Sequence, residues 1–207
     1  MAHAMELVGD RWALAVVREL MLGPRRFGDL RADLPGLSAN VLTQRLTELE
    51  ADNIVLKTKL PPPANVQVYE LTTWGYEAEP IIQELGRWAA RSPGHDATLP
   101  ISRVSILLSL RTMIAPAKIG DLRLTVGFRW GTDEYLGRLD ADGLAIARGR
   151  AEDGDIVFAG APNAFAAFIY GGVPVEQLSG ALSVAGDPAL AARFAALFEL
   201  PPKFLRE

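Results

Sequence analysis

The segment from Ser38 to Glu50 constrains the fold of this chain more than any other feature of the sequence. Its leucines recur at the spacing of one helix face, at Leu42, Leu46 and Leu49. Ser38 is a natural N-cap, because its hydroxyl can accept a hydrogen bond from a free backbone N–H of the first turn. The opposite side carries uncharged side chains that donate and accept hydrogen bonds, namely Asn40, Thr43, Gln44 and Thr47. The sequence therefore predicts a helix that is held on a domain by its leucines and presents a neutral polar face outward.

Two helices are predicted before this segment. The apolar pattern over residues 7–21 forms one helix face, and Gly23-Pro24 is a strong stop after it. Apolar residues recur at spacings of three and four over residues 27–34, which predicts a short second helix that Pro35-Gly36 ends.

Two strands and a further helix are predicted after it. The strand patterns run from Ile54 to Leu60 and from Gln67 to Thr72, and the prolines between them favour a stiff loop over a tight two-residue hairpin. The next helix can be capped by Thr72 or Thr73 and runs to Trp88, with a kink or break expected at Pro80.

This order of elements is that of a winged helix-turn-helix, in which a short helix enters the DNA major groove. Asparagine and glutamine can pair with the adenine edge, and threonine can bond a base or touch a thymine methyl. The arginines just before the second helix and the lysines beside the loop are expected to reach phosphate. Arg45 is expected to reach a phosphate or a guanine. The DNA-binding residues predicted from this pattern are Arg25, Arg26, Ser38, Asn40, Thr43, Gln44, Arg45, Lys57 and Lys59. Taken singly, each also fits an ordinary surface helix, a solvated turn or a protected strand edge, so the prediction depends on their combination.

The charge of the chain gives this interpretation no support. The formal net charge is -4 and the isoelectric point is about 5.3, and neither half of the chain is basic. A non-specific nucleic-acid binder is expected to be basic. Any DNA-binding face must therefore gather the basic residues locally.

Several stretches of the first half resemble the HxlR family of bacterial winged-helix regulators. They are Gly9-Asp10-Arg11-Trp12, Arg18-Glu19-Leu20, Gly23-Pro24-Arg25-Arg26-Phe27, Leu30, Leu37-Ser38, Val41-Leu42-Thr43-Gln44-Arg45-Leu46, Leu49 and Tyr69-Glu70-Leu71-Thr72. The resemblance covers about residues 1–92. It implies a homodimer that binds double-stranded DNA through two recognition helices, with the terminal helices forming the dimer. Many members have a cysteine near the N-terminus, some of them redox or electrophile sensors, but this chain contains none, which excludes thiol sensing by these residues.

The second half changes to a pattern of strands followed by short helices. Strands are predicted over residues 123–130, 134–139, 143–148 and 155–160, with a hairpin signal at residues 140–143. Helical segments follow over residues 162–170, 174–179 and 187–198. The fold class expected for the whole chain is α+β, with a mostly helical winged domain that carries a two-stranded wing.

Residues of about 100–200 are similar to the sterol-carrier-protein-like domain. The matching features are the strand Leu122 to Trp130, the strand that ends at Ala159-Gly160 before Pro162-Asn163-Ala164-Phe165, and the stretch from Leu182 to Leu190. The resemblance implies a sheet covered by helices, with an apolar cavity for a lipid-like or other hydrophobic molecule. The candidate wall residues are Phe128, Trp130, Phe158, Phe165, Phe168, Phe194 and Phe198, each of which also fits an ordinary core position.

Catalysis is not expected. The histidines are His3 and His95, and no nucleophile–histidine–acid arrangement, metal-ligand spacing or phosphate-binding loop accompanies them. We expect no catalytic residue, no metal and no cofactor.

The predicted organisation is a DNA-binding and dimerisation domain over residues 1–92, a linker over 93–98 and a hydrophobic-ligand domain over 99–207. We expect a homodimeric transcription regulator that answers a small hydrophobic molecule. Two alternatives remain. One is a lipid or hydrophobic-ligand carrier whose first half serves dimerisation; the other is a second half that is a structural spacer or an extra dimer contact with a filled core. No apolar run suits a spanning helix and the start is unlike a signal peptide, so we expect a cytoplasmic protein without a membrane partner.

Overall fold

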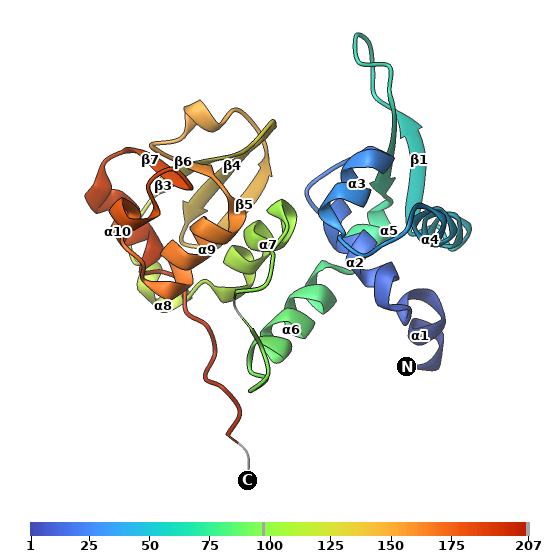
Figure 1. Ribbon diagram of the computed structural model, residues 1–207, viewed down its shortest axis with the longest axis horizontal. Coiled ribbons are helices and arrows are strands. Elements are labelled where there is room, and N and C mark those ends of the chain that lie inside the picture. The colour runs from blue at the N-terminus through green and yellow to red at the C-terminus, as the bar shows by residue number, and fades with distance from the viewer. Residues whose placement is uncertain (97, 206–207) are drawn as a thin grey trace. The chain divides into compact units, whose positions relative to one another are not determined.

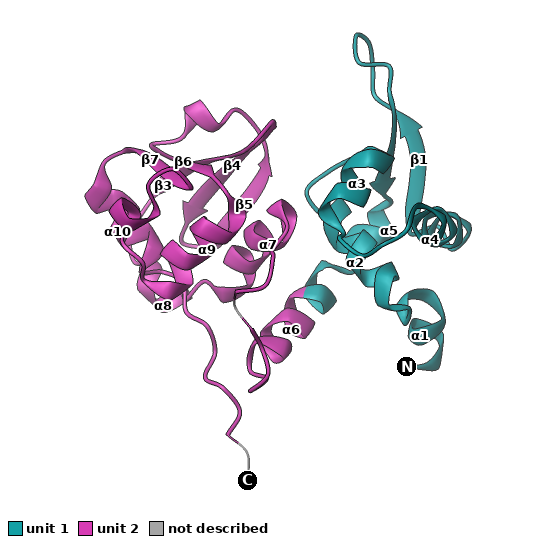
Figure 2. Cartoon of the chain, in the orientation of Figure 1, with its two compact units in different colours: residues 1–82 teal, residues 83–207 magenta. Residues whose placement is uncertain are grey.

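The computed structural model describes residues 1–96 and 98–205. The chain divides into two compact units, Met1–Ile82 and Gln83–Glu207, which are coloured separately in Figure 2. The division falls inside one helix, earlier in the sequence than the predicted linker over 93–98. Residue 97 of that linker and residues 206–207 of the predicted second domain lie outside the described residues. The mixture of helices and sheets confirms the α+β class.

Unit 1 begins with the helices α1 (Ala2–Val8), α2 (Arg11–Leu20), α3 (Phe27–Asp33) and α4 (Ala39–Ala51). The apolar pattern over residues 7–21 is divided between α1 and α2, because Asp10 caps α2 by accepting a hydrogen bond from the Trp12 backbone N–H at 2.8 Å. The leucines of α3 and α4 are buried against α2, and the core of the unit includes Val16, Leu20, Leu30, Leu42 and Leu46. Burial of one face of each helix fixes α4 on the unit.

A hairpin follows α4. Its strands β1 (Val55–Lys59) and β2 (Gln67–Leu71) pair antiparallel, and the loop between them projects from the unit in Figure 1. Arg25 adds a short bridge to Tyr69, with both backbone N–H groups donating to the opposite carbonyl at 2.8 and 2.9 Å. The bridge joins the segment before α3 to the wing.

The last helical pattern of the first half is broken near its proline. The short α5 (Thr73–Tyr76) ends before α6 (Glu79–Ala90), and Pro80 lies in the first turn of α6. A missing backbone N–H costs little there, since first-turn N–H groups have no partner within the helix. The proline thus separates two helices and leaves α6 intact.

Unit 2 contains, in its described part, a five-stranded sheet in the order β5-β4-β3-β6-β7. Its strands are β3 (Leu124–Trp130), β4 (Asp133–Asp140), β5 (Gly143–Arg148), β6 (Ile156–Gly160) and β7 (Leu182–Gly186). β3 and β6 are parallel and the other neighbours antiparallel. The helical elements are α7 (Arg103–Met113), α8 (Pro116–Ile119), η1 (Ala151–Asp153), α9 (Pro162–Gly171), η2 (Val175–Leu178) and α10 (Pro188–Ala195).

Helices α7, α9 and α10 lie along one side of the sheet (Figure 1). Phe128 and Phe158 of the central strands contact Phe165 of α9, and Phe158 also contacts Phe194 of α10. On the other side, η1 approaches β3 so closely that a Cβ on Gly127 would lie 1.9 Å from the Ala151 carbonyl oxygen. The sequence patterns predicted four of the five strands but neither α7 nor β7. α7 is buried along most of its length, so its sequence lacks the alternation of polar and apolar faces that marks a surface helix.

Over the described residues, none of the helices combines the length and apolar character that crossing a bilayer requires. The same residues contain no grouping of three or more histidine, cysteine or acidic side chains that could hold a metal ion.

Candidate nucleic-acid interface

Helix α4 presents a polar face on a firmly held helix. The Ser38 hydroxyl caps it by accepting a hydrogen bond from the Val41 backbone N–H at 3.3 Å. Leu42, Leu46 and Leu49 are buried, as their spacing predicts, whereas the outer face is exposed over Asn40, Thr43, Gln44 and Thr47. A polar face of this kind on a packed helix matches the geometry of a helix that enters a DNA groove.

The threonines on this face are tied to the helix itself. Thr43 donates its hydroxyl hydrogen to the Ala39 carbonyl, and Thr47 donates to the Thr43 carbonyl, both at 2.9 Å. Their hydroxyl oxygens keep lone pairs, so each can accept a hydrogen bond from a base amino group. Thr43 and Thr47 therefore offer acceptors along the outer face.

Arg45 lies in a different place from the one its sequence position predicts. Its guanidinium pairs with Glu48 at 2.6 Å and lies 3.7 Å from the Asp10 carboxylate, with 17% of the side chain exposed. The pairing occupies the fork that would otherwise grip phosphate or guanine. Arg45 links α4 to the start of α2 in this structure.

The wing carries the predicted lysines on its surface. Lys57 and Lys59 are exposed on β1, opposite Tyr69 and Gln67 of β2. They alternate with Thr58, so their side chains leave the same side of the strand. This side of the hairpin presents two positive charges beside the projecting loop.

The two arginines before α3 are placed differently. Arg25 is buried and forms an ion pair with Asp33, with 1% and 9% of the two side chains exposed. The prediction that Arg25 contacts DNA is therefore corrected, because its guanidinium neutralises an internal carboxylate. Arg26 is exposed, and its backbone N–H donates to Asp29 at 3.4 Å.

The aromatic residues predicted as a cavity wall gather on the helix-covered side of the sheet in unit 2. Phe128, Phe158 and Phe165 are fully buried and contact one another, with ring centroids 4.9 to 6.2 Å apart. Neighbouring rings extend this cluster to Trp130, Phe168, Phe194 and Phe198. These distances are those of rings in direct contact.

Two polar groups of unit 2 are removed from solvent, the Trp130 indole N–H and the Tyr170 hydroxyl. The Trp130 indole is 1% exposed, and no acceptor among the described residues bonds its Nε1–H. The Tyr170 hydroxyl lies 2.7 Å from the Ser109 hydroxyl, and burial raises the pKa of Tyr170. Tyr170 consequently remains protonated and neutral in the interior.

Glu48 and Asp10 contact predicted DNA-binding residues of α4, and neither contact was predicted from the sequence. Glu48 accepts a hydrogen bond from Gln44 Nε2 at 3.0 Å as well as pairing with Arg45. It follows Gln44 by four positions and Arg45 by three, which are the spacings of side chains that meet on a helix. That spacing was a signal available in the sequence.

Known proteins match the half of the chain that carries α4 and the wing. Residues 7–96 match the family described as HxlR-like helix-turn-helix. The chain is 37% identical over 87 residues to the uncharacterized HTH-type transcriptional regulator YvaP of Bacillus subtilis, covering 42% of this chain and 80% of that protein. It is 36% identical over 89 residues to the HTH-type transcriptional regulator YodB of the same organism, covering 43% and 80%. A solved structure of YodB in its reduced form is 34% identical, with 46% and 95% covered and a TM-score of 0.42.

The relatives found are named as transcriptional regulators, and the chain is accordingly a regulator and not an enzyme. The match contains the stretches around Asp10, Ser38 and Tyr69 on which the resemblance was noted. On this similarity, the chain belongs to the HxlR family of HTH-type transcriptional regulators.

Proposed function

We propose that the protein binds double-stranded DNA as a homodimer, with α4 of each copy in the major groove. The observation that carries this proposal is the exposed face of α4, which presents the uncharged polar side chains of Asn40, Thr43 and Gln44. Asparagine and glutamine can each bond adenine through two hydrogen bonds, and threonine can bond either kind of base. Membership of a regulator family supports the same use of this face.

The basic contacts in this proposal are fewer than the sequence predicts. Lys57 and Lys59 on the wing and Arg26 before α3 are exposed and remain candidates for phosphate contact. Ser38 contributes through the cap that begins α4. Arg25 and Arg45 are left out, because both are engaged in ion pairs within unit 1.

The homodimer is supported by an exposed apolar stripe on α6. Ile81, Leu85 and Trp88 follow one another at spacings of four and three, and Trp88 is 73% exposed. Large apolar side chains aligned on one exposed helix face mark an interaction site more often than a solvated surface. Before the residues that match the family, Met5 of α1 and the preceding Met1 are also exposed. We assign these helices to the contact between two copies.

A gel-shift assay tests the use of α4. Protein with Gln44→Ala or Asn40→Ala should bind its operator about 1–3 kcal/mol more weakly and discriminate less between related sequences. Gln177→Ala is the matched control, because Gln177 is an exposed glutamine in unit 2. Unchanged binding by both α4 variants would show that another face meets DNA.

For unit 2 we propose a sterol-carrier-like domain that takes up a small hydrophobic molecule and changes the affinity of the dimer for DNA. The gathered aromatic rings supply an apolar environment, and the buried Trp130 N–H supplies a donor. A buried donor without an acceptor costs about 1–3 kcal/mol, which an oxygen atom of a bound molecule can offset. These 207 residues contain no cysteine, so none of them can sense through a thiol.

Native mass spectrometry of the purified protein tests the unit 2 proposal. We expect a population of protein molecules that is heavier than the chain by the mass of one small molecule. Denaturation should release that molecule. Trp130→Phe keeps the apolar surface but removes the N–H, and it should reduce that population; Trp74→Phe, in unit 1, should not. Protein that never carries added mass favours the alternative in which unit 2 is a spacer with a filled core.

A further inference from the structure

We propose that Glu48 is a positioning residue that fixes the orientation of the Gln44 amide and thereby selects adenine at the base that Gln44 meets. The proposal rests on the use of α4 for DNA binding. Its observation is the hydrogen bond from Gln44 Nε2 to Glu48 Oε1, 3.0 Å long, between side chains one helical turn apart.

A carboxylate can only accept hydrogen bonds, so it faces the amino end of the glutamine amide and not its oxygen. A glutamine on a bare helix can rotate its amide by half a turn and exchange donor and acceptor. Next to Glu48, the amino group of Gln44 is held on the Glu48 side and the Oε1 atom on the other. The exposed amide therefore presents its groups in one order.

This order suits adenine and disfavours guanine. Of the two amino hydrogens of Gln44, one is used by Glu48, and we infer that the other lies with the Oε1 atom on the edge that meets a base. Adenine offers an acceptor at N7 and a donor at N6 in the major groove, which match that edge. Guanine offers two acceptors, O6 and N7, and a glutamine with one remaining N–H cannot satisfy both.

Glu48 is itself held in place by Arg45. Arg45 Nη1 lies 2.6 Å from Glu48 Oε2, and Nη2 donates to Glu48 Oε1 at 3.1 Å, so the contact joins the two terminal guanidinium nitrogens to both carboxylate oxygens. The same Nη1 is 3.7 Å from Asp10, the residue that caps α2. A forked pair of this kind restricts the carboxylate to one orientation. Successive contacts thus connect the start of α2 to Gln44 through Arg45 and Glu48.

Selection of binding sites from a randomised duplex library tests the proposal. The wild-type protein should enrich a site in which one position prefers adenine about tenfold or more, and Gln44→Ala should abolish the preference at that position. Glu48→Gln should reduce it to about threefold or less, because a neutral amide can face Gln44 with either its donor or its acceptor. Glu50→Gln, which removes the same charge from an exposed position of α4, should keep the full preference.

Glu48→Ala also removes the acceptor, and alanine favours helix, so this variant replaces Glu48→Gln if Glu48→Gln folds poorly. It should show the same loss of adenine preference. The double variant Gln44→Ala/Glu48→Gln should lose no more adenine preference than Gln44→Ala. Retention of the preference by folded Glu48→Gln or Glu48→Ala would overturn the role of Glu48 alone. If the wild-type protein enriches no sequence, the proposed DNA-binding function is overturned as well.

Discussion

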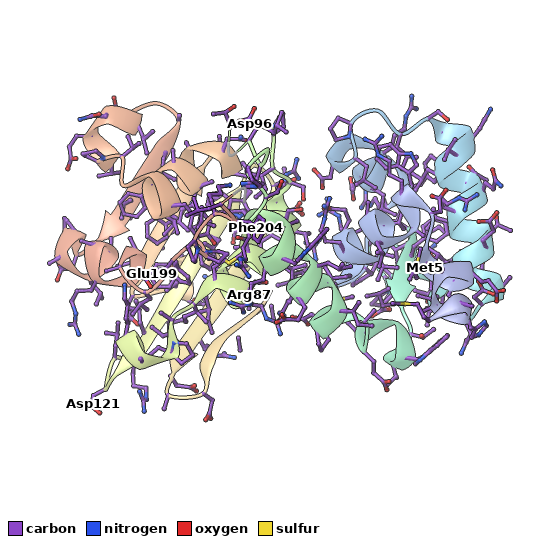
Figure 3. All side chains as sticks on the ribbon, turned by 90° about the horizontal axis from the view of Figure 1, so that it is seen from below. Met5, Arg87, Asp96, Asp121, Glu199 and Phe204 are labelled. Carbon is purple, nitrogen blue, oxygen red and sulfur yellow. The ribbon has the colours of Figure 1, made fainter. Side chains whose placement is uncertain are left out.

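The ammonium group of Lys203 donates a hydrogen bond to the carbonyl of Ala90, the last residue of α6, at 3.0 Å. It also donates to the Ser92 carbonyl at 3.2 Å, and the Phe204 backbone N–H donates to the Arg91 carbonyl at 2.8 Å. A cation at the C-terminus of a helix is favoured because the last carbonyls carry partial negative charge. Arg87 makes a second link from α6, to the Thr112 carbonyl at the end of α7 (Figure 3 labels Arg87 and Phe204). Unit 2 therefore holds the second half of the helix that we assign to dimerisation.

Replacement of Lys203 by alanine should loosen the end of α6. We expect the backbone amides of residues 88–95 to exchange with deuterium faster in Lys203→Ala, because the carbonyls lose their shared donor. Lys118→Ala is the control, since Lys118 bonds the Ala196 carbonyl elsewhere in unit 2. Equal exchange over residues 88–95 in wild type and Lys203→Ala would show that Lys203 does not stabilise the end of α6.

The buried pair of Arg25 and Asp33 predicts that replacement of Arg25 lowers the free energy of unfolding. Arg25→Ala removes the guanidinium that pairs with the buried Asp33 carboxylate, and we expect a loss of about 3–5 kcal/mol in the free energy of unfolding. Arg26→Ala should change that free energy by no more than about 0.5 kcal/mol, because its side chain is exposed. Urea denaturation of both variants makes the comparison. A stable Arg25→Ala protein would contradict the structural role of the pair.

The apolar stripe on α6 predicts the oligomeric state. Trp88→Ser should convert the dimer to a monomer at concentrations where the wild type is dimeric, because the largest exposed apolar side chain of the stripe is lost. Light scattering on a size-exclusion column gives the mass directly. Trp74→Ser removes another exposed tryptophan, on α5, and should leave the dimer intact. A dimeric Trp88→Ser protein would place the contact on another surface.

The close approach of β3 and η1 predicts that Gly127 tolerates no side chain. A Cβ there would meet the Ala151 carbonyl 1.9 Å away, so the backbone of unit 2 must shift. We expect Gly127→Ala to destabilise the protein by at least about 1–3 kcal/mol. Gly28→Ala, where an added Cβ meets nothing within 4 Å, should instead stabilise it by about 0.4–1 kcal/mol. Thermal unfolding of the two variants should therefore shift in opposite directions.

Much of unit 1 could be predicted because its signals are local. The cap at Ser38, the leucines of α4 and the prolines of the wing each act within a few residues, and the structure places them as their spacing predicts. In unit 2, the edge strand β7 was missed, because it is five residues long and buries only Leu182, which leaves a weak strand pattern in the sequence.

The side-chain partners were harder to predict than the elements. Arg25 and Asp33 are eight positions apart and meet only because the chain turns between them, and Arg45 and Asp10 come from different helices. Sequence position indicated that Arg25 and Arg45 are available to DNA, whereas tertiary contacts engage both. By contrast, Gln44 and Glu48 lie at helical spacing, and their contact could have been predicted.

Footprinting of the wild-type protein on fragments captured from genomic DNA at low salt shows whether a dimer binds DNA through α4. We expect two symmetric protected half-sites whose centres are about one helical turn, or ~34 Å, apart. We also expect Gln44→Ala to lose this protection at protein concentrations at which Gln177→Ala retains it. If a confirmed dimer captures no specific fragment, or if Gln44→Ala leaves the footprint unchanged, the dimer does not bind DNA through α4.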